Sequence, residues 1–144
     1  MTQPAPPLRR RFPSARRADA ANRVAAMVRA IEGDLRRDWT VSDMAAVLGV
    51  SASQLRRLVF QALGASPRQV LCNVRLETAA RLLVDPAVRI KEIQARVGIA
   101  DASHFCRDFR DRFGVSPSEY RYRLQASRTN SIDNHARSGQ ETTD

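Results

Sequence analysis

The stretch GIADASHFCRDFRDRFGVSP, residues 98–117, repeats in outline an earlier stretch, GVSASQLRRLVFQALGASP at residues 49–67. Each stretch opens with glycine, continues through a short polar segment into a basic and apolar one, and closes with Gly-x-Ser-Pro. The likeness extends upstream, because residues 41–49 align with residues 90–98. The chain therefore contains two copies of one structural unit.

Each copy has the pattern of two short helices separated by a glycine. Apolar residues recur at helical spacing up to Gly49 in the first copy and up to Gly98 in the second. A further helical segment follows and ends at Gly64 or Gly114, where glycine is typical of the position just past a helix C-terminus. Helix, glycine turn and helix together predict a helix-turn-helix unit in each copy.

The segment between the two copies predicts one long helix. Ser66 is placed as its N-cap, Pro67 as its first residue and Gln69 as the partner of the cap in a capping box. The helix is expected to continue until an Asp-Pro pair at residues 85–86. Its roughly 18 residues would span about 27 Å, so it acts as a spacer between the units.

These patterns predict an all-α protein of about seven helices, with two helix-turn-helix subdomains joined by a long linker helix. The expected segments are a disordered basic arm at 1–21, a first helix-turn-helix subdomain at 22–65, the linker helix at 66–84, a second subdomain at 85–124 and a disordered tail at 125–144. The arm is rich in proline and contains three consecutive arginines, at residues 9–11, which are a candidate minor-groove contact.

The composition favours a polyanionic partner. The chain has 24 basic and 15 acidic residues, a formal net charge of +9, and Lys91 as its only lysine. Arginine suits phosphate and guanine, although a GC-rich genome explains the same bias equally well. No apolar stretch has the length of a membrane span, and the basic N-terminus is not followed by the apolar segment of an export signal, so we expect a cytoplasmic protein without membrane contact.

The residue types that carry catalysis or bind metals are sparse. Cys72 and Cys106 have no CxxC partner, and His104 and His135 are not spaced with them as zinc ligands. No cysteine nucleophile with an activating base, carboxylate pair or phosphate loop is evident. We therefore expect no enzyme activity, no cofactor and no metal, with Cys106 a small residue rather than a redox switch and His104 a partly buried packing residue.

A helix-turn-helix places its second helix in the major groove of DNA. Two such helices on a stiff spacer can enter successive major-groove segments of one duplex. Double-stranded DNA is therefore the partner that the repeat predicts.

The span 22–123 resembles the DNA-binding domain of the AraC/XylS family of bacterial transcription regulators. The resemblance includes the linker segment RLETAARLL at residues 75–83 and the closing segment FGVSPSEYRYR at residues 113–123. It implies a transcription regulator that contacts promoter DNA and, in addition, RNA polymerase. The chain is similar to the short members without a sensor domain, which implies action as a monomer; a partner-supplied sensor and a truncated gene are the alternatives.

The resemblance also implies which residues contact DNA. They are Ala52, Ser53, Arg56 and Arg57 on the first recognition helix, and Ala102, Ser103, Cys106, Arg107 and Arg110 on the second. With Leu55, Leu58 and Val59 facing inward, Arg56 faces outward and can bind guanine, at about 1–3 kcal/mol of discrimination, or else contact phosphate or solvent. Arg57 and Arg107 occupy equivalent places in the two copies, so a phosphate or inter-helix role competes with base reading.

Several positions depart from the family pattern. Val59 and Phe60 stand where an aromatic and a basic residue are usual, and Arg89 replaces the usual Ser or Thr cap of the second unit. Asp108 and Asp111 are expected to pair along the helix with Arg112 and Arg107 and to repel phosphate. The alternative to a sequence-specific regulator is consequently a module that binds protein, RNA polymerase or another regulator, with weak or non-specific DNA binding.

Overall fold

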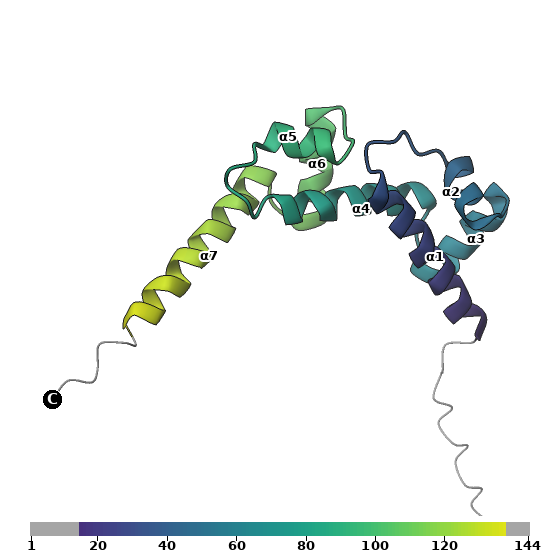
Figure 1. Ribbon diagram of the computed structural model, residues 1–144, viewed down its shortest axis with the longest axis horizontal. Helices are drawn as coiled ribbons and strands as arrows, with labels where there is room; N and C mark the ends of the chain where they lie inside the picture. Colours follow the sequence, from purple (N-terminus) through teal and green to yellow (C-terminus); the bar gives the residue numbers. More distant parts are fainter. Residues whose placement is uncertain (1–14, 138–144) are drawn as a thin grey trace, which may run out of the picture.

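The computed structural model describes residues 15–137, with side chains to residue 132, and the proposed contact of Arg9 to Arg11 lies outside these residues. The described part is all-α, with seven helices and no strand, as the sequence predicts. The helices form two subdomains, one at each end of helix α4 (Figure 1).

The first subdomain contains α1 (Ala15–Gly33), α2 (Val41–Leu48) and α3 (Ala52–Leu63). Helix α1 begins at Ala15 rather than near residue 22, so the expected disordered arm at 1–21 is too long. The periodic stripe of large apolar residues begins only at Val24, whereas the preceding segment ARRADAA, residues 15–21, consists mostly of strong helix formers, and its Ala20 is buried.

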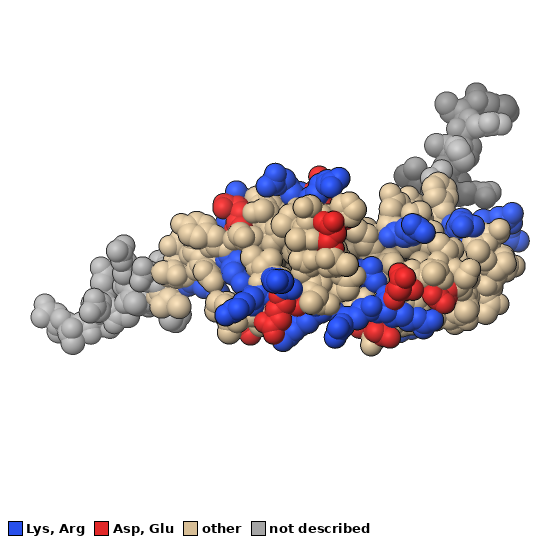
Figure 2. All heavy atoms as spheres, turned by 90° about the horizontal axis from the view of Figure 1, so that it is seen from above, with Lys and Arg blue, Asp and Glu red and all other residues tan. Residues whose placement is uncertain are grey.

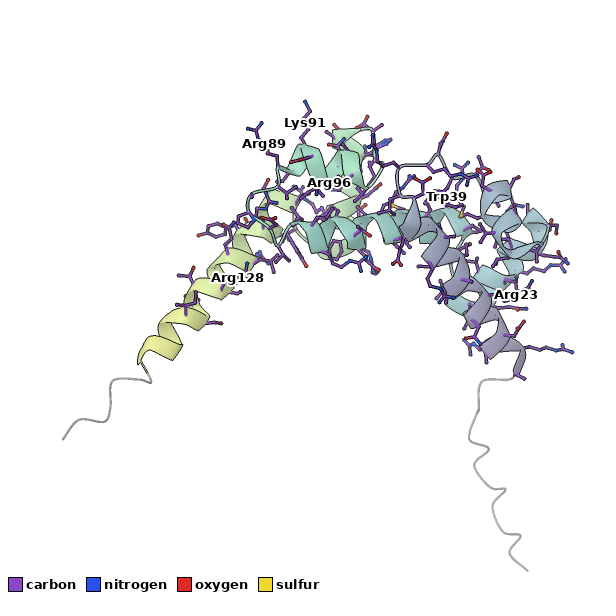
Figure 3. All side chains as sticks on the ribbon, in the orientation of Figure 1. Arg23, Trp39, Arg89, Lys91, Arg96 and Arg128 are labelled. Carbon is purple, nitrogen blue, oxygen red and sulfur yellow. The ribbon has the colours of Figure 1, made fainter. Side chains whose placement is uncertain are left out.

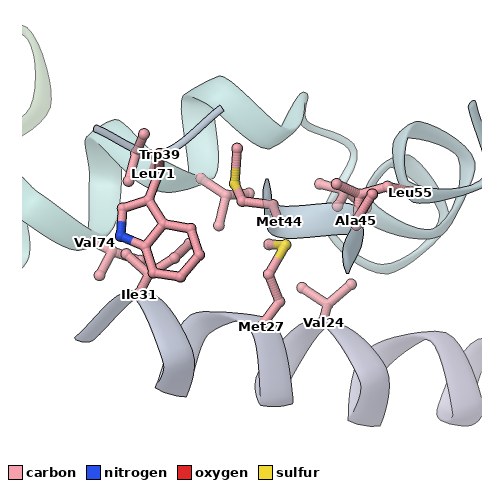
Figure 4. Packing of buried hydrophobic residues seen from close by; sticks show 11 residues of the cluster. Val24, Met27, Ile31, Trp39, Met44, Ala45, Leu55, Leu71 and Val74 are labelled. Carbon is pink, nitrogen blue, oxygen red and sulfur yellow. The ribbon is translucent and has the colours of Figure 1, made fainter. Parts of the chain in front are cut away.

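The core of this subdomain lies between α1, α2, α3 and the first half of α4. Figure 4 shows Met27 and Ile31 of α1 packed beside Met44 of α2, with Trp39 closing one end. The Trp39 indole Nε1 donates a hydrogen bond to the carbonyl oxygen of Asp34 at 2.8 Å, so the ring is buried without leaving its N–H unpaired. Trp39 thereby fixes the loop that leads from α1 into the first helix-turn-helix unit.

Helix α4 (Pro67–Leu82) connects the subdomains. The predicted capping box is present, since Ser66 Oγ accepts from the Gln69 backbone N–H and Gln69 Oε1 accepts from that of Ser66. The helix has 16 residues, about 24 Å in length. Its first half packs into one core and its second half into the other.

The second subdomain contains α5 (Ile90–Arg96), α6 (Ala102–Phe113) and α7 (Pro117–Arg137). Its core is built around Phe109, whose ring centroid lies 5.9 Å from that of Phe105, 4.5 Å from that of Phe113 and 5.4 Å from that of Tyr120. Phe105 and Phe109 are buried and Phe113 is half-buried, so the phenylalanines of α6 belong to the core. Arg89, just before α5, makes no side-chain cap, as its replacement of the usual Ser or Thr predicts.

Helix α7 extends beyond the predicted end of the fold. The tail was expected to be disordered from residue 125, yet the helix continues to Arg137 and projects away from the second subdomain (Figure 1). The side chains at residues 125–132 are all exposed, and the segment has no apolar periodicity. The end of the helix was predicted from that periodicity, so this part of α7 was missed. No glycine or proline interrupts residues 118–137, and the helix started at Pro117 is not broken.

Contacts at the junction hold the two subdomains together. Leu35, in the loop after α1, packs against the cores of both. Gly98, in the turn after α5, has a φ of 80°, and a Cβ atom there would overlap the carbonyl oxygen of Leu35. The Arg75 guanidinium of α4 donates to the carbonyl oxygens of Leu35 and Arg37. The orientation of one unit relative to the other is thus fixed by packing and hydrogen bonds as well as by α4.

Candidate nucleic-acid interface

The first recognition helix, α3, is oriented by two fully buried side chains. Leu55 and Val59 are 0% exposed and hold one face against α1 and α2. Its N-terminus has a capping box between Ser51 and Gln54 that was not predicted from the sequence. Of the four predicted contacts on α3, Ser53, Arg56 and Arg57 are exposed and Ala52 is half-buried.

The second recognition helix, α6, is oriented in the same way by Phe105 and Phe109. Asp101 is its N-cap and accepts a hydrogen bond from the His104 backbone N–H, and this bond is the main reason that the pKa of Asp101 is lowered. All five predicted contacts on this helix are exposed: Ala102, Ser103, Cys106, Arg107 and Arg110.

The repeat aligns the outward faces of the two helices residue by residue. Ser53 and Arg57 of α3 correspond to Ser103 and Arg107 of α6. Phe60 lies one turn beyond Arg57, on the same face, and corresponds to Arg110. Phe60 is 68% exposed, although it is not among the contacts predicted from the sequence. Because Phe60 aligns with Arg110, a predicted contact, the repeat itself could have identified Phe60 as a residue of the site.

Two further basic residues come from neighbouring helices. Arg23 of α1 lines a shallow hollow together with Arg57, and its guanidinium donates to the carbonyl oxygen of Leu48 at 3.5 Å. Lys91 of α5 lines a hollow with Ala102 and Cys106 of α6. In Figure 3, Lys91 points away from the body of the protein. Arg23 and Lys91 could not be predicted from the spacing of residues within a recognition helix, because they lie on other helices.

The acidic residues of α6 differ from expectation. Arg112 does not pair with Asp108 but with Glu77 of α4, with 2.6 Å between Nη2 and Oε1. Asp108 is half-buried and accepts a weak hydrogen bond from the Cys72 thiol, with 3.8 Å between Sγ and Oδ2. Asp108 faces α4 rather than the outward side, because it lies on the same side of α6 as Phe105. Only Asp111 of the two remains exposed on this helix.

Charge is distributed over both subdomains. On the face shown in Figure 2, Lys and Arg side chains lie along both long edges and at the right-hand end, with acidic side chains among them. No ion pair within residues 15–132 involves Arg56, Arg57, Arg107 or Arg110. These four guanidinium groups are therefore available to an anionic partner.

A polar cleft of about 680 Å³ separates the two units on the side of the α1–α2 loop. Trp39 and Arg75 line it from the first subdomain and α4, and His104 and Asp108 line it from α6. His104 is exposed in this cleft, so the prediction that it is a partly buried packing residue is wrong. It follows Ser103 on α6 and lies outside the stripe that packs into the core.

Within the described helices, none combines the length and hydropathy that crossing a membrane requires. The same part of the chain contains no group of three or more His, Cys, Asp or Glu side chains placed to hold a metal ion.

The fold and this surface define a double helix-turn-helix protein, with two equivalent recognition helices carried at the ends of one linker helix. A family model described as a helix-turn-helix domain matches residues 44–123, and the chain belongs to this family, within the AraC/XylS group of regulators. This agrees with the resemblance noted in the sequence.

Individual relatives and solved structures agree with this assignment. The transcriptional activator NphR of a Rhodococcus species is 40% identical over 94 residues, which are 65% of this chain and 28% of NphR. An AraC-type regulator of Chromobacterium violaceum has a TM-score of 0.69 at 29% identity, covering 74% of this chain and 96% of that one. The DNA-binding domain of AdpA, solved with a target DNA, has a TM-score of 0.65 at 27% identity, covering 76% and 96%. The chain spans about a third of the length of the curated relatives it matches.

Proposed function

We propose that the protein is a bacterial transcription regulator that binds double-stranded DNA sequence-specifically, with α3 and α6 in two adjacent major-groove segments. The observation that carries the proposal is the equivalence of the two outward faces, Ser53 and Arg57 on α3 with Ser103 and Arg107 on α6. The relative AdpA, whose DNA-binding domain was solved with DNA, supports the choice of partner.

The predicted contact residues divide into three roles. Arg56 carries a planar fork suited to the O6 and N7 atoms of guanine, so we assign it to base reading. Arg57, Arg107 and Arg110 are assigned to phosphate and to base edges along the groove, and Ala52, Ser53, Ala102, Ser103 and Cys106 to close approach of the helix N-termini to the bases. The proposal includes no catalytic step, cofactor or metal.

The wider setting follows from the resemblance. We propose that the protein acts in the cytoplasm, binds DNA as a monomer, and contacts RNA polymerase at the promoter. A monomer suffices because one chain carries two recognition helices, whereas proteins with one helix-turn-helix need a dimer to contact two half-sites.

The second candidate function is a protein-interaction module with weak or non-specific DNA binding. The observation that favours it is the exposed ring of Phe60, since a large apolar side chain on the outward face also suits a protein partner.

Selection of bound duplexes from a random library, followed by affinity measurement, distinguishes the two. The regulator is expected to enrich one sequence with two conserved segments about one helical turn apart and to lose affinity steeply between low and physiological salt. Equal binding of selected and random duplexes supports the interaction module instead. A flat salt response contradicts both the electrostatic role of the arginines and the proposed function.

A further inference from the structure

Phe60 is the one exposed ring among the phenylalanines of the described residues. It is 68% exposed, whereas Phe105 and Phe109 are at most 1% exposed and Phe113 is half-buried. Exposure of a ring this large is unfavourable in water, and a partner that covers it recovers that free energy. The position of the ring indicates which partner.

The ring lies on the outward face of α3, in line with Ser53 and Arg57 at helical spacings of seven and three residues. In α6 the same place belongs to Arg110. The two recognition helices therefore end their outward faces differently, with an apolar ring on one and a cation on the other.

Phe60 forms one wall of an open hollow of about 500 Å³ between α3 and the turn into α4. The other walls are largely apolar, and they include the side chains of Arg56 and Arg57. Neither arginine makes an ion pair with any side chain in the described part of the chain. A largely apolar hollow that is also lined by two arginines suits an apolar group attached to a polyanion.

The major groove of DNA offers one such group. Among the four base pairs, only those with thymine present an apolar substituent there, the 5-methyl group. Phosphates on either side of the groove supply the negative charge that the two guanidinium groups require.

We infer that Phe60 contacts the 5-methyl group of a thymine in the DNA segment bound by α3, so that the two half-sites are read by different chemistry. The inference rests on the proposed function, since it requires α3 to lie in the major groove. Arg110 at the equivalent position of α6 makes no such contact, and the segment that α6 binds is insensitive to thymine methyl groups at the corresponding place.

The test uses a duplex selected from the random library by the full chain. Each thymine is replaced in turn by deoxyuridine, which lacks only the methyl group, and the Kd is measured for the wild-type protein, Phe60→Ala and the control Leu63→Ala. Leu63 is 56% exposed on the same helix and does not line the hollow, so it controls for loss of exposed apolar surface. Circular dichroism checks that each variant is folded.

Replacing one thymine of the first half-site is expected to lower the affinity of the wild-type protein about fourfold, which is the factor for burying one methyl group. This loss is expected to disappear in Phe60→Ala and to persist in Leu63→Ala. Equal loss in the wild type and in Phe60→Ala, or no sensitive thymine, overturns the inference while leaving sequence-specific binding intact. Unchanged affinity of Phe60→Ala for the thymine duplex also overturns it. If no duplex is selected at all, the proposed function itself fails.

Discussion

Arg112 of α6 and Glu77 in the second half of α4 form an ion pair within the second subdomain, with 2.6 Å between Nη2 and Oε1. The pair attaches the second recognition helix directly to the linker helix. The hydrogen bond between the Cys72 thiol and Asp108 lies at the same helix pair. Besides the apolar packing of the core, two polar contacts thus join α6 to α4, and neither involves the predicted DNA-contacting residues of α6.

Glu77→Gln is expected to change orientation more than stability. The two side chains are 52% and 43% exposed, and pairs this accessible to solvent contribute about 1 kcal/mol or less. Urea unfolding should show a loss within that limit, while affinity for the selected duplex falls because α6 is less well fixed. Glu92→Gln, which breaks the Arg96 pair within α5, is the matched control and should leave affinity unchanged. Unfolding that is destabilised by more than 2 kcal/mol contradicts this assignment.

Arg56→Ala and Arg107→Ala are expected to differ in what they change. Removing a guanine contact costs about 1–3 kcal/mol on the specific duplex and relaxes preference at one base pair, whereas removing a phosphate contact weakens all duplexes alike and lowers the salt slope by about one. We expect the first result for Arg56 and the second for Arg107. Arg128→Ala, on the projecting part of α7, serves as the control for loss of one positive charge.

If Arg56→Ala loses affinity equally for specific and random duplexes, Arg56 contacts phosphate rather than a base. A change of sequence preference in Arg107→Ala has the opposite meaning, and places base reading in the second half-site as well.

Much of the fold was predictable from the sequence because the helix-turn-helix pattern occurs twice in the chain. Glycines at equivalent points of both copies, and the Ser66 capping box, placed the helices and the linker. Two helix ends were predicted wrongly, the start of α1 at Ala15 and the end of α7 at Arg137. The first segment is helical because it is rich in alanine, and the second because no glycine or proline interrupts it. Neither segment has an apolar stripe. Local signals of that kind are weaker than a buried face.

The site was less predictable, because its polar contacts depend on tertiary structure. Spacing along α6 favoured a pair between Asp108 and Arg112, but α4 brings Glu77 to the same guanidinium. Lys91 joins the surface of α6 only because α5 packs against it. Phe60 was recognised in the sequence as a departure from the family pattern, and the structure adds that the ring is exposed beside two free arginines.

The two cysteines are expected to differ in their reaction with iodoacetamide. Cys106 is exposed on the outward face of α6, whereas burial, assisted by the nearby Asp108 carboxylate, raises the pKa of the Cys72 thiol. A raised pKa lowers the thiolate fraction at neutral pH, so Cys72 should react slowly, with its rate increasing only as the pH rises above the ordinary thiol range. Mass spectrometry after timed alkylation measures both rates.

Adding the selected duplex should slow the alkylation of Cys106 and leave that of Cys72 unchanged. Because Cys106 lies on the proposed DNA face, equal rates with and without DNA would remove this part of α6 from the interface.

Phe109→Ala is expected to unfold the second subdomain preferentially. The ring is 0% exposed and contacts three other aromatic rings, so its removal should cost about 3–5 kcal/mol. Hydrogen exchange should show loss of protection in α5 and α6 before α1 to α3, because the two cores are separate clusters. Phe113→Ala, at a half-buried position, is the milder control. Uniform loss of protection in both subdomains indicates instead that they unfold as one cooperative unit.

Gly98→Ala is expected to weaken DNA binding by disturbing the junction, and Gly49→Ala is its matched control. Both residues have positive φ, at 80° and 65°, and an L-residue in this conformation costs about 1–2 kcal/mol. A Cβ atom at Gly49 has nothing within 4 Å, whereas at Gly98 it would meet the backbone of Leu35, which packs against both cores. Gly49→Ala should therefore lose only the conformational cost, and Gly98→Ala should lose more stability and shift the second unit away from the first. Thermal unfolding and duplex affinity measure the two effects. If the two variants lose equal stability and equal affinity, the contact between Gly98 and Leu35 does not hold the recognition helices in their relative orientation.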